Sequence, residues 1–363
     1  MALAVDQHTA RGDLDELTAP AAMRRGSHTS KEFSAHYNHV EREIHNTIVG
    51  LQETTRLALA SFFAGGHVLL EGRPGVAKTL LAKSIAASMD LQFSRIQFTP
   101  DLLPSDIVGC SILEQKADGS KAFRFNKGPI FANIVLADEI NRASPKTQSA
   151  LLEAMAEGQV TVDGITYKLP DPFFVIATQN PVESEGTFIL PEAQLDRFLG
   201  KIVVPPPSED ELVEICLRNG KPGGNTTSKI EAILDEETVI RMRESIYDIS
   251  ITPELCRLGV RIAMGLDPEH HAPNQPKMGD DNYKYCLFVR GADSIIRLSQ
   301  SLASIDGRDC VSADDIREAS TPTLQHRIAL AFIGSEEAVN LEADINRVVN
   351  REISAFEANL KKA

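Results

Sequence analysis

The sequence predicts an α/β protein with a mostly parallel sheet that helices cover on both faces, followed by a smaller α-helical domain. Strand-like apolar runs alternate with amphipathic helical patterns through residues 31–206, and this alternation is typical of parallel sheets. A glycine-rich turn joins the first strand to the helix after it at residues 72–79. Three consecutive prolines at 205–207 then end the strand pattern, since proline continues neither a helix nor a central strand. Everything after Ser208 reads as helical, with no convincing strand.

The composition indicates a soluble protein of ordinary globular type. The 363 residues are 42% apolar and 24% charged, and 37 basic against 51 acidic residues give a net charge of −14. This acidity argues against a general surface for nucleic acid or anionic membranes. The five cysteines are odd in number and show no CxxC or Cys/His ligand spacing, which favours a reduced, cytoplasmic protein. No apolar run approaches the roughly 18 residues of a membrane span, so we expect no membrane insertion.

The first elements in chain order are two helices. Residues 1–30 are polar and aperiodic, and we expect a mobile N-terminal arm there. The helical pattern begins at Lys31, and a second helix ends at the glycine pair Gly65 and Gly66, a typical stop signal. The apolar residues of the first helix recur three or four positions apart: Phe33, Tyr37, Val40 and Ile44.

Strands and helices then alternate. A strand at 67–72, a helix at 79–90 and a strand at 93–99 form a βαβ unit, and further apolar strands end at Asp138 and Thr178. This order predicts that the sheet is mostly parallel. Two hairpin insertions, each with a glycine-containing turn between alternating segments, are expected at residues 112–125 and 159–169.

The C-terminal part predicts an α-helical domain at residues 207–335 and a helical tail at residues 336–363. A polar insertion at 267–282 is expected to be an exposed loop, and its adjacent His270 and His271 lack the carboxylate spacing of a closed metal site. The tail carries an apolar stripe that packs on the preceding helices or binds another protein, and we favour packing. The stripe consists of Leu341, Ile345, Val348, Val349, Ile353, Phe356 and Leu360.

Residues 72–79, GRPGVAKT, follow the phosphate-binding P-loop pattern, with Ala77 in place of the second glycine. Backbone N–H groups at a helix N-terminus bind phosphate oxygens, while Lys78 supplies a charge to the β- and γ-phosphates and the Thr79 hydroxyl binds Mg²⁺. The alternative is a glycine turn that ends in a solvated lysine. We expect the phosphates of ATP to contact Gly72, Pro74, Gly75, Val76, Ala77, Lys78, Thr79 and Leu80.

An apolar run at residues 133–140, NIVLADEI, ends on two acids, Asp138 and Glu139. A buried unpaired carboxylate is costly, so the pair needs a positive partner or a capping role. In P-loop enzymes an apolar strand beside the P-loop strand ends in an aspartate that holds Mg²⁺, which predicts metal binding by Asp138. Glu139 is then placed to orient or deprotonate the attacking water. The alternative, an N-cap for the next helix, is disfavoured because Ser144 and Pro145 are a better helix start.

Three sequence blocks together resemble the AAA+ ATPases, and specifically the MoxR family. The blocks are GRPGVAKT, IVLADEINRASPKTQSALLEAMAEGQV and FFVIATQNPVESEGTFILPEAQLDRF, of which the third is the most diagnostic. The resemblance covers about residues 45–205 and continues more weakly at 307–319 and 323–328. The N-terminal arm and the tail after about residue 335 lie outside it.

The resemblance implies an AAA+ αβα nucleotide-binding domain and a small α-helical lid domain, assembled into a ring that is usually a hexamer. ATP and Mg²⁺ would lie between neighbouring subunits. MoxR-like proteins work with partners that often carry a von Willebrand factor A domain, and they help to mature other proteins or to insert metals or cofactors into them. We therefore expect an ATP-driven remodeller of a client protein. A nucleic-acid motor and a nucleotide-gated scaffold with little turnover are the alternatives.

The resemblance also implies roles for single residues around the nucleotide. Asn180, which ends the strand after the acidic one, matches sensor 1 and would position the water. Arg197 matches the arginine finger that reaches the neighbour's γ-phosphate, unless it forms a surface ion pair with Asp196 or Glu192. Arg142 is a second candidate to act in trans, although its spacing from the second acid also suits a helical salt bridge.

The lid of such proteins carries a sensor 2 arginine, which matches Arg290 here, with Arg297 as the fallback because the surrounding family pattern is not kept. Val49 and Gly50 match the segment that contacts adenine, and plain helix-to-strand packing is the alternative there. The two hairpins fit insertions that decorate this branch of the family, so we expect them to contact substrates or partners rather than to take part in catalysis.

Overall fold

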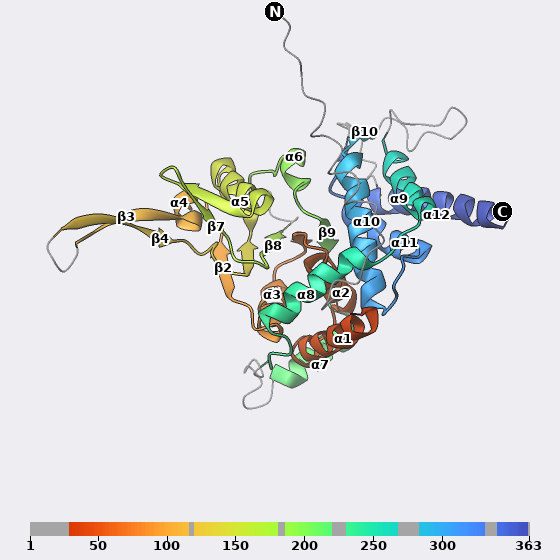
Figure 1. Ribbon diagram of the computed structural model, residues 1–363, viewed down its shortest axis with the longest axis horizontal. Helices are drawn as coiled ribbons and strands as arrows, with labels where there is room; N and C mark the ends of the chain where they lie inside the picture. The colour runs from red at the N-terminus through yellow and green to blue at the C-terminus, as the bar shows by residue number, and fades with distance from the viewer. Residues whose placement is uncertain are drawn as a thin grey trace, which may run out of the picture.

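A parallel sheet of five strands forms the centre of the protein (Figure 1). The computed structural model describes residues 29–115, 120–180, 186–219, 230–267, 283–330 and 340–361. The strands in spatial order are β2 (Phe93–Gln97), β5 (Ile134–Asp138), β8 (Phe174–Gln179), β1 (Val68–Glu71) and β9 (Gly200–Val203). The predicted α/β fold with a parallel sheet is confirmed.

Both faces of this sheet are buried, as the side chains of β1 show. Val68 and Leu70 belong to one hydrophobic core, whereas Leu69 belongs to a second core. Successive residues of a strand face opposite sides of the sheet, so helices cover both sides. The first core includes residues of α1 (Ser30–Thr47), α2 (Gln52–Phe63) and α3 (Lys78–Ser88), and the second includes residues of α5 (Pro145–Glu157).

Helix α1 follows the predicted apolar stripe. Its start is a capping box, in which Thr29 Oγ1 accepts the N–H of Glu32 and the Glu32 carboxylate accepts the N–H of Thr29. Such a box satisfies N–H groups that have no acceptor within the helix. The buried residues of the helix include the four predicted ones, Phe33, Tyr37, Val40 and Ile44.

The strand order corrects one expectation, namely that the strand ending in Asp138 lies beside the P-loop strand. In the sheet, β8 lies between β5 and β1 and pairs with both. Parallel strands are joined by crossovers, so neighbours in the sheet need not be neighbours in the chain. The sequence pattern reveals each strand but not its position, and here β8 places its own end between the P-loop and the two acids.

Both predicted hairpins are present. β3 (Gly109–Gln115) pairs with β4 (Lys121–Lys127), and β6 (Gln159–Val162) pairs with β7 (Ile165–Lys168), both in antiparallel register. The β3–β4 hairpin follows the short helix α4 (Pro104–Val108) and projects far from the sheet (Figure 1).

Local contacts shape the second hairpin and join it to the first. The turn between β6 and β7 has positive φ at Asp163 (51°) and at Gly164 (78°), as the tight type I′ turn requires. The rings of Phe125 in β4 and Tyr167 in β7 stack with their centroids 4.1 Å apart. The two hairpins are therefore connected at their bases.

The segment after the prolines is mainly helical, but the expectation that it contains no strand is wrong. β10 (Tyr283–Cys286) and β11 (Ile328–Leu330) form a two-stranded antiparallel sheet. Strands of this length are too short to display an alternating pattern. The helices are α7 (Glu209–Asn219), α8 (Glu236–Ser245), α9 (Pro253–Met264), α10 (Phe288–Ile305), α11 (Ala313–Leu324) and α12 (Leu341–Leu360); shorter elements are α6 (Glu192–Leu195), η1 (Ile140–Arg142) and η2 (Ile246–Asp248).

Helix α12 packs on the lid helices through the first part of its stripe. Ile345, Val348, Val349 and Ile353 are buried, and the helix contacts α9 and α11. Leu360, near the end of the helix, is 58% exposed. The expected packing of the tail is confirmed for the buried part of the stripe.

Some expectations concern residues outside the described ranges. These are the N-terminal arm through residue 28, the turn of the first hairpin at 116–119, and the polar insertion from 268 to 282 with His270 and His271. Among the helices that the structure does describe, each is too short or too polar to cross a membrane.

Candidate active site

The phosphate loop, residues 72–79, connects the carboxyl end of β1 to α3. φ is +84° at Gly75 and +59° at Ala77, and left-handed residues in such turns form anion-binding nests of N–H groups. The first N–H groups of α3 have no acceptor within the helix, and the helix dipole favours negative charge beside them. A Cβ on Gly72 would lie 3.0 Å from both the Cβ and the carbonyl oxygen of Val204, so this end of the loop has little room for a side chain.

Ala77 stands at the position of the second glycine in the P-loop pattern. Its φ of +59° and ψ of +18° lie in the left-handed region, which costs an L-residue roughly 1–2 kcal/mol. Glycine has no such penalty. The alanine therefore keeps the turn at the expense of local backbone strain.

Lys78, the first residue of α3, has its ammonium group bound to the backbone of the loop. Nζ donates to the carbonyl of Gly72 at 2.5 Å and to that of Gln179 at 3.5 Å. Partial burial lowers the pKa of Lys78, and the nearby carboxylates of Asp138 and Glu139 oppose this shift. The fold thus brings the P-loop lysine close to both predicted acids.

Asp138 is buried at the end of β5, and both of its carboxylate oxygens are bound. Thr178 Oγ1 donates to Oδ1 at 2.6 Å, and Arg95 donates to Oδ2 through Nε at 3.1 Å and Nη2 at 2.7 Å. The Thr178 hydroxyl also accepts the N–H of Glu139 at 2.9 Å. Neither acid caps α5, because the N-cap of that helix is Ser144, as expected.

Glu139 has a left-handed backbone, with a φ of +56°, and its side chain is bound by two neighbours. Oε2 accepts from Gln97 Nε2 at 2.9 Å and pairs with Arg142 Nε at 3.0 Å. Arg142 therefore forms the salt bridge that its spacing allowed, within its own chain. Gln97 Oε1 accepts from Arg95 Nη2 at 2.6 Å, so two side chains of β2 connect the two acids.

Arg95 and Gln97 are site residues that the sequence interpretation missed. They stand two positions apart in β2 and therefore on one face of the strand. Two long polar side chains at such a spacing in a short strand were the available signal. These side chains lie beside the acids because Gln97 pairs with Asp138 in the sheet register. This pairing is not visible in the sequence.

The two remaining predicted site residues on this side, Asn180 and Thr79, also lie near the carboxyl ends of the strands. Asn180 comes directly after β8 and is buried, and Thr79 is the second residue of α3. The Thr79 hydroxyl and the Asp138 carboxylate are oxygen ligands of the kind that Mg²⁺ prefers. The Arg95 side chain on Asp138 is 47% exposed, so it can move into solvent. The residues of this edge therefore fit a nucleotide with Mg²⁺.

Val49 and Gly50 form the turn between α1 and α2. A Cβ on Gly50 would lie 2.2 Å from Glu211 Oε1 of α7, and a Cβ on Gly72 would contact Val204. The segment from Val204 to Glu211 therefore touches the phosphate loop at one end and this turn at the other. The predicted adenine segment is therefore linked to the phosphate loop through that segment.

The arginines expected to act on phosphate lie near the amino ends of the strands, at the opposite end of the sheet from the phosphate loop. Arg197, Arg290 and Arg297 line a cavity of about 320 Å³ together with Gly66 and His67. His67 precedes β1, whereas the phosphate loop follows it, and the strand between them spans roughly 13 Å at about 3.3 Å per residue. The structure therefore does not bring these arginines to the phosphate loop of their own chain.

The three arginines differ in what holds them. Arg197 is exposed, and its Nη1 donates to the carbonyl of Leu152 at 2.6 Å. Arg297 Nη2 donates to the carbonyl of Ala64 at 2.6 Å, a cation at the C-terminus of α2 where the helix dipole favours it. The side chain of Arg290 is 63% exposed. Arg290 is therefore more accessible to a ligand than Arg297.

The carboxylate of Asp196 binds two other arginines. Arg327 Nε lies 2.8 Å from Oδ1, and Arg290 Nη1 lies 3.2 Å from Oδ2. The sequence interpretation missed Arg327, although it falls inside the weaker matching block at 323–328. Because this residue is buried at a contact between distant segments, its role depends on the fold.

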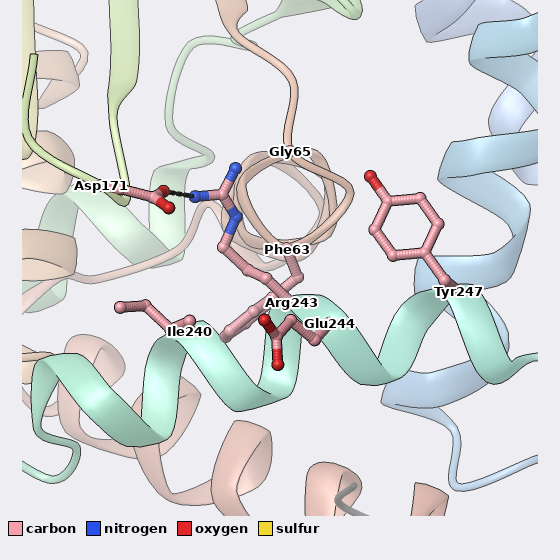
Figure 2. A pocket seen from close by; sticks show the side chains of 7 residues that line it. All are labelled: Phe63, Gly65, Asp171, Ile240, Arg243, Glu244 and Tyr247. Carbon is pink, nitrogen blue, oxygen red and sulfur yellow. Dashed lines mark hydrogen bonds and ion pairs between the residues drawn. The ribbon is translucent and has the colours of Figure 1, made fainter. Parts of the chain in front are cut away.

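A second cavity, of about 160 Å³, lies beside Gly65 (Figure 2). Arg243 of α8 points toward Asp171, with Nη1 3.2 Å from Oδ1, and its guanidinium lies over the ring of Phe62 at 5.7 Å from the centroid. Burial lowers the pKa of Arg243, and Asp171 opposes that shift. This arginine connects α8 to the sheet domain, and none of the predicted site residues lines the cavity.

Comparison with known proteins places the chain in a family. Residues 67–200 match the ATPase family associated with various cellular activities (AAA), and residues 288–348 match the AAA lid domain. The chain is 41% identical to chaperone MoxR1 of Mycobacterium tuberculosis over 85% of its own length and 79% of that protein. It is also 41% identical to the uncharacterized protein YeaC of Bacillus subtilis, over 85% of its own length and 91% of YeaC.

A solved structure supports the same assignment. The crystal structure of a candidate ATPase from Cytophaga hutchinsonii has a TM-score of 0.79 and 35% sequence identity, covering 88% of this chain and 95% of that one. The lid match reaches residue 348, which corrects the expectation that the resemblance ends at about residue 335. The chain belongs to the MoxR family of AAA+ ATPases.

Proposed function

We propose that this protein hydrolyses ATP at the junctions between copies of itself in a ring, for which the family favours a hexamer. One observation carries the proposal. Lys78 and the acids lie at the carboxyl ends of the strands, and the exposed Arg197 and Arg290 lie near the amino ends. A single chain therefore carries two separate half-sites. Head-to-tail association joins such complementary surfaces and closes into a ring when the rotation permits.

In this proposal the P-loop edge holds the nucleotide. Lys78 and the N–H groups of the loop bind the β- and γ-phosphates, and Val49 and Gly50 contact the adenine. Thr79 and Asp138 would hold Mg²⁺, which would neutralise part of the phosphate charge. Because Arg95 donates to Oδ2 of Asp138, this ion pair would have to open for that oxygen to serve as a ligand.

In this proposal two residues, Glu139 and Asn180, act on the attacking water. Glu139 accepts the proton of the attacking water, and Asn180 orients that water. Gln97 and Arg142 hold the Glu139 carboxylate in this structure. Both contacts fall on Oε2, so Oε1 can accept the proton of the water while the two partners hold the carboxylate in place.

The neighbouring subunit supplies the cations. Arg197 reaches the γ-phosphate, where negative charge increases during transfer, and Arg290 reaches the same phosphates from the lid. Fingers of this kind are worth about 10³ to 10⁵ in rate where they have been measured in GTPases. Hydrolysis therefore depends on contact between two subunits.

The hydrolysis serves to remodel a client protein in the cytoplasm, including its maturation by insertion of a metal or cofactor. The similarity to a protein named chaperone MoxR1 supports a remodelling role, and a von Willebrand factor A domain protein is the proposed partner. The projecting β3–β4 hairpin, with Leu113 55% and Phe123 77% exposed, is the proposed client contact. The net charge of −14 disfavours nucleic acid as the client.

Three variants test the shared site. Lys78→Ala should lose nucleotide affinity, Glu139→Gln should bind ATP without turning it over, and Arg197→Ala should assemble but hydrolyse slowly. Mixing Arg197→Ala with Lys78→Ala should restore turnover, because some junctions then combine an intact P-loop with an intact arginine. If mixed rings form without any recovery, action in trans is refuted. Wild-type turnover of Glu139→Gln would refute the role of that acid.

A further inference from the structure

Arg327 is a buried charge where the lid meets the sheet domain. It lies in the turn between α11 and β11, and its side chain is only 2% exposed. Burial lowers the pKa of its guanidinium, and the ion pair with Asp196 opposes that shift. A buried arginine is favourable only where its donors are satisfied, so its contacts indicate what it holds.

The guanidinium of this residue binds the backbone on both sides of Arg197. Nε donates to Asp196 Oδ1 at 2.8 Å, and Nη2 donates to the carbonyls of Asp196 at 3.2 Å and Phe198 at 2.7 Å. Nη1 donates to the carbonyl of Leu199 at 3.2 Å and to that of Thr323 in α11. All three guanidinium nitrogens are therefore used, and most of their acceptors flank the proposed arginine finger.

The two residues before Arg327 extend the same contact. His326 Nε2 donates to the carbonyl of Phe198 at 3.1 Å, and Gln325 Nε2 donates to the carbonyl of Lys201 at 2.5 Å. Because β9 is at the edge of the sheet, one side of its backbone is open to such partners. This three-residue turn holds the start of β9 and the segment before it to the lid.

Asp196 connects the buried arginine to the second exposed one. Its Oδ1 accepts from Arg327, and its Oδ2 pairs with Arg290 at 3.2 Å. Arg290 stands in the first turn of α10 in the lid, and Arg197 is the residue after Asp196. The Asp196 carboxylate therefore links Arg290 to the segment that carries Arg197.

We propose that Arg327 is a positioning residue that makes the lid and the Arg197 segment move as one unit. Arg197 and Arg290 then reach the neighbouring subunit's phosphates together, and a change in lid position advances or withdraws both cations at once. Arg327 acts through the segment that it holds, because all three of its guanidinium nitrogens are bound to acceptors of the protein itself. The inference rests on the proposed function, in which the two exposed arginines act in trans.

The first test is Arg327→Lys in the full chain. Lysine keeps the charge but lacks the planar fork that binds several acceptors at once. We expect assembly and KM for ATP to stay unchanged, and kcat to fall by about tenfold to a hundredfold, as small misplacements of a catalytic group do. The matched control is Arg308→Lys, since Arg308 forms a similar two-point pair with Asp315 inside the lid; its kcat should change by less than about twofold.

A combined variant separates positioning from a general structural role. In a background that lacks both exposed arginines, Arg197→Ala with Arg290→Ala, Arg327→Lys should cost little further kcat, because the buried arginine acts only through those two cations. A fully multiplicative loss would overturn the proposal. Mixing Arg327→Lys with Lys78→Ala should restore turnover, because the second chain supplies correctly placed arginines, and failure to do so in mixed rings would also overturn it.

The outcomes distinguish this inference from the proposed function. If Arg197→Ala turns over ATP as fast as wild type, the shared site itself is refuted. If Arg197→Ala is slow while Arg327→Lys keeps wild-type kcat, only the positioning role is refuted. Should Arg327→Lys unfold, Asp196→Asn tests the same connection, because it weakens the Arg290 pair while keeping the side-chain shape; wild-type kcat in that variant would refute the coupling.

Discussion

His67 is a buried imidazole whose titration should make the protein less stable in acid. Nδ1 accepts the N–H of Val175 at 3.1 Å, and Nε2 donates to the carbonyl of Met155 at 3.1 Å. A second ring proton would be placed on Nδ1, which faces a donor. Burial lowers the pKa of His67 from 6.5 to about 4, the Met155 contact opposes this, and the charges of Arg243 and Arg297 add to the lowering.

The two pKa values of His67 give the size and the sign of the effect. Between pH 6.5 and about 4 the unfolded chain binds this proton and the folded chain does not, so stability falls as the pH decreases. The stabilising contribution is complete above pH 6.5 and is lost progressively toward the folded pKa. At about 1.36 kcal/mol per pKa unit, the full loss is about 3.4 kcal/mol, and about 2 kcal/mol of it is already lost at pH 5.

His67→Gln isolates this contribution, because the amide of glutamine can donate to Met155 and accept from Val175 without titrating. Urea unfolding measures the free energy of unfolding at several pH values from about 7.5 to 5. We expect the wild type to lose about 2 kcal/mol more than the variant over this range. His39→Gln, which changes an exposed residue of α1, should follow the wild type. Parallel pH curves for wild type and His67→Gln would refute the argument.

Three further substitutions test the nucleotide edge. Ala77→Gly should raise the free energy of unfolding by about 0.5–1 kcal/mol, because relief of the left-handed strain exceeds the added entropy of the unfolded chain; a lower value in urea unfolding would contradict this. Arg95→Gln should reduce the Mg²⁺ concentration needed to tighten binding of a fluorescent ATP analogue, since it frees Asp138 Oδ2, and an increased requirement would count against that competition. Thr178→Val should slow steady-state turnover by roughly tenfold while Mg²⁺-free nucleotide binding is kept, because a hydrogen bond to a charged group is worth about 1.5–3 kcal/mol; unchanged turnover would remove Thr178 from the site.

Much of the fold could be predicted because its signals are contiguous in the chain. The phosphate loop needs one strand, one turn and one helix in order, and all three occur between Val68 and Ser88. The strand before Asp138 is a fully buried run, which an apolar stretch of that length predicts directly. Helix α1 was visible through its spacing, and the hairpin at Asp163 and Gly164 through its turn residues.

Other features could not be predicted because they depend on how distant segments meet. Arg95 and Gln97 gain their role from the pairing of β2 with β5, and Arg327 from the packing of the α11–β11 turn on the start of β9. The sequence also identified Arg197 and Arg290 without revealing that both lie away from the phosphate loop of their chain. Local pattern carries no information on such long-range geometry.

The position of β8 explains why binding and turnover should depend on different residues. The carbonyl of Gln179 accepts from the N–H of Gly72 and from Lys78, and the hydroxyl of Thr178 holds Asp138 and the N–H of Glu139. A slip of one residue in the register with β1 would turn the Thr178 side chain to the other face of the sheet. One chain therefore brings the predicted phosphate loop and the two acids together by itself, through a strand that contacts both. The structure does not bring Arg197 and Arg290 to that place within one chain. In the proposed ring their loss should therefore lower kcat more than it weakens nucleotide binding, which steady-state turnover and binding of a fluorescent ATP analogue would measure.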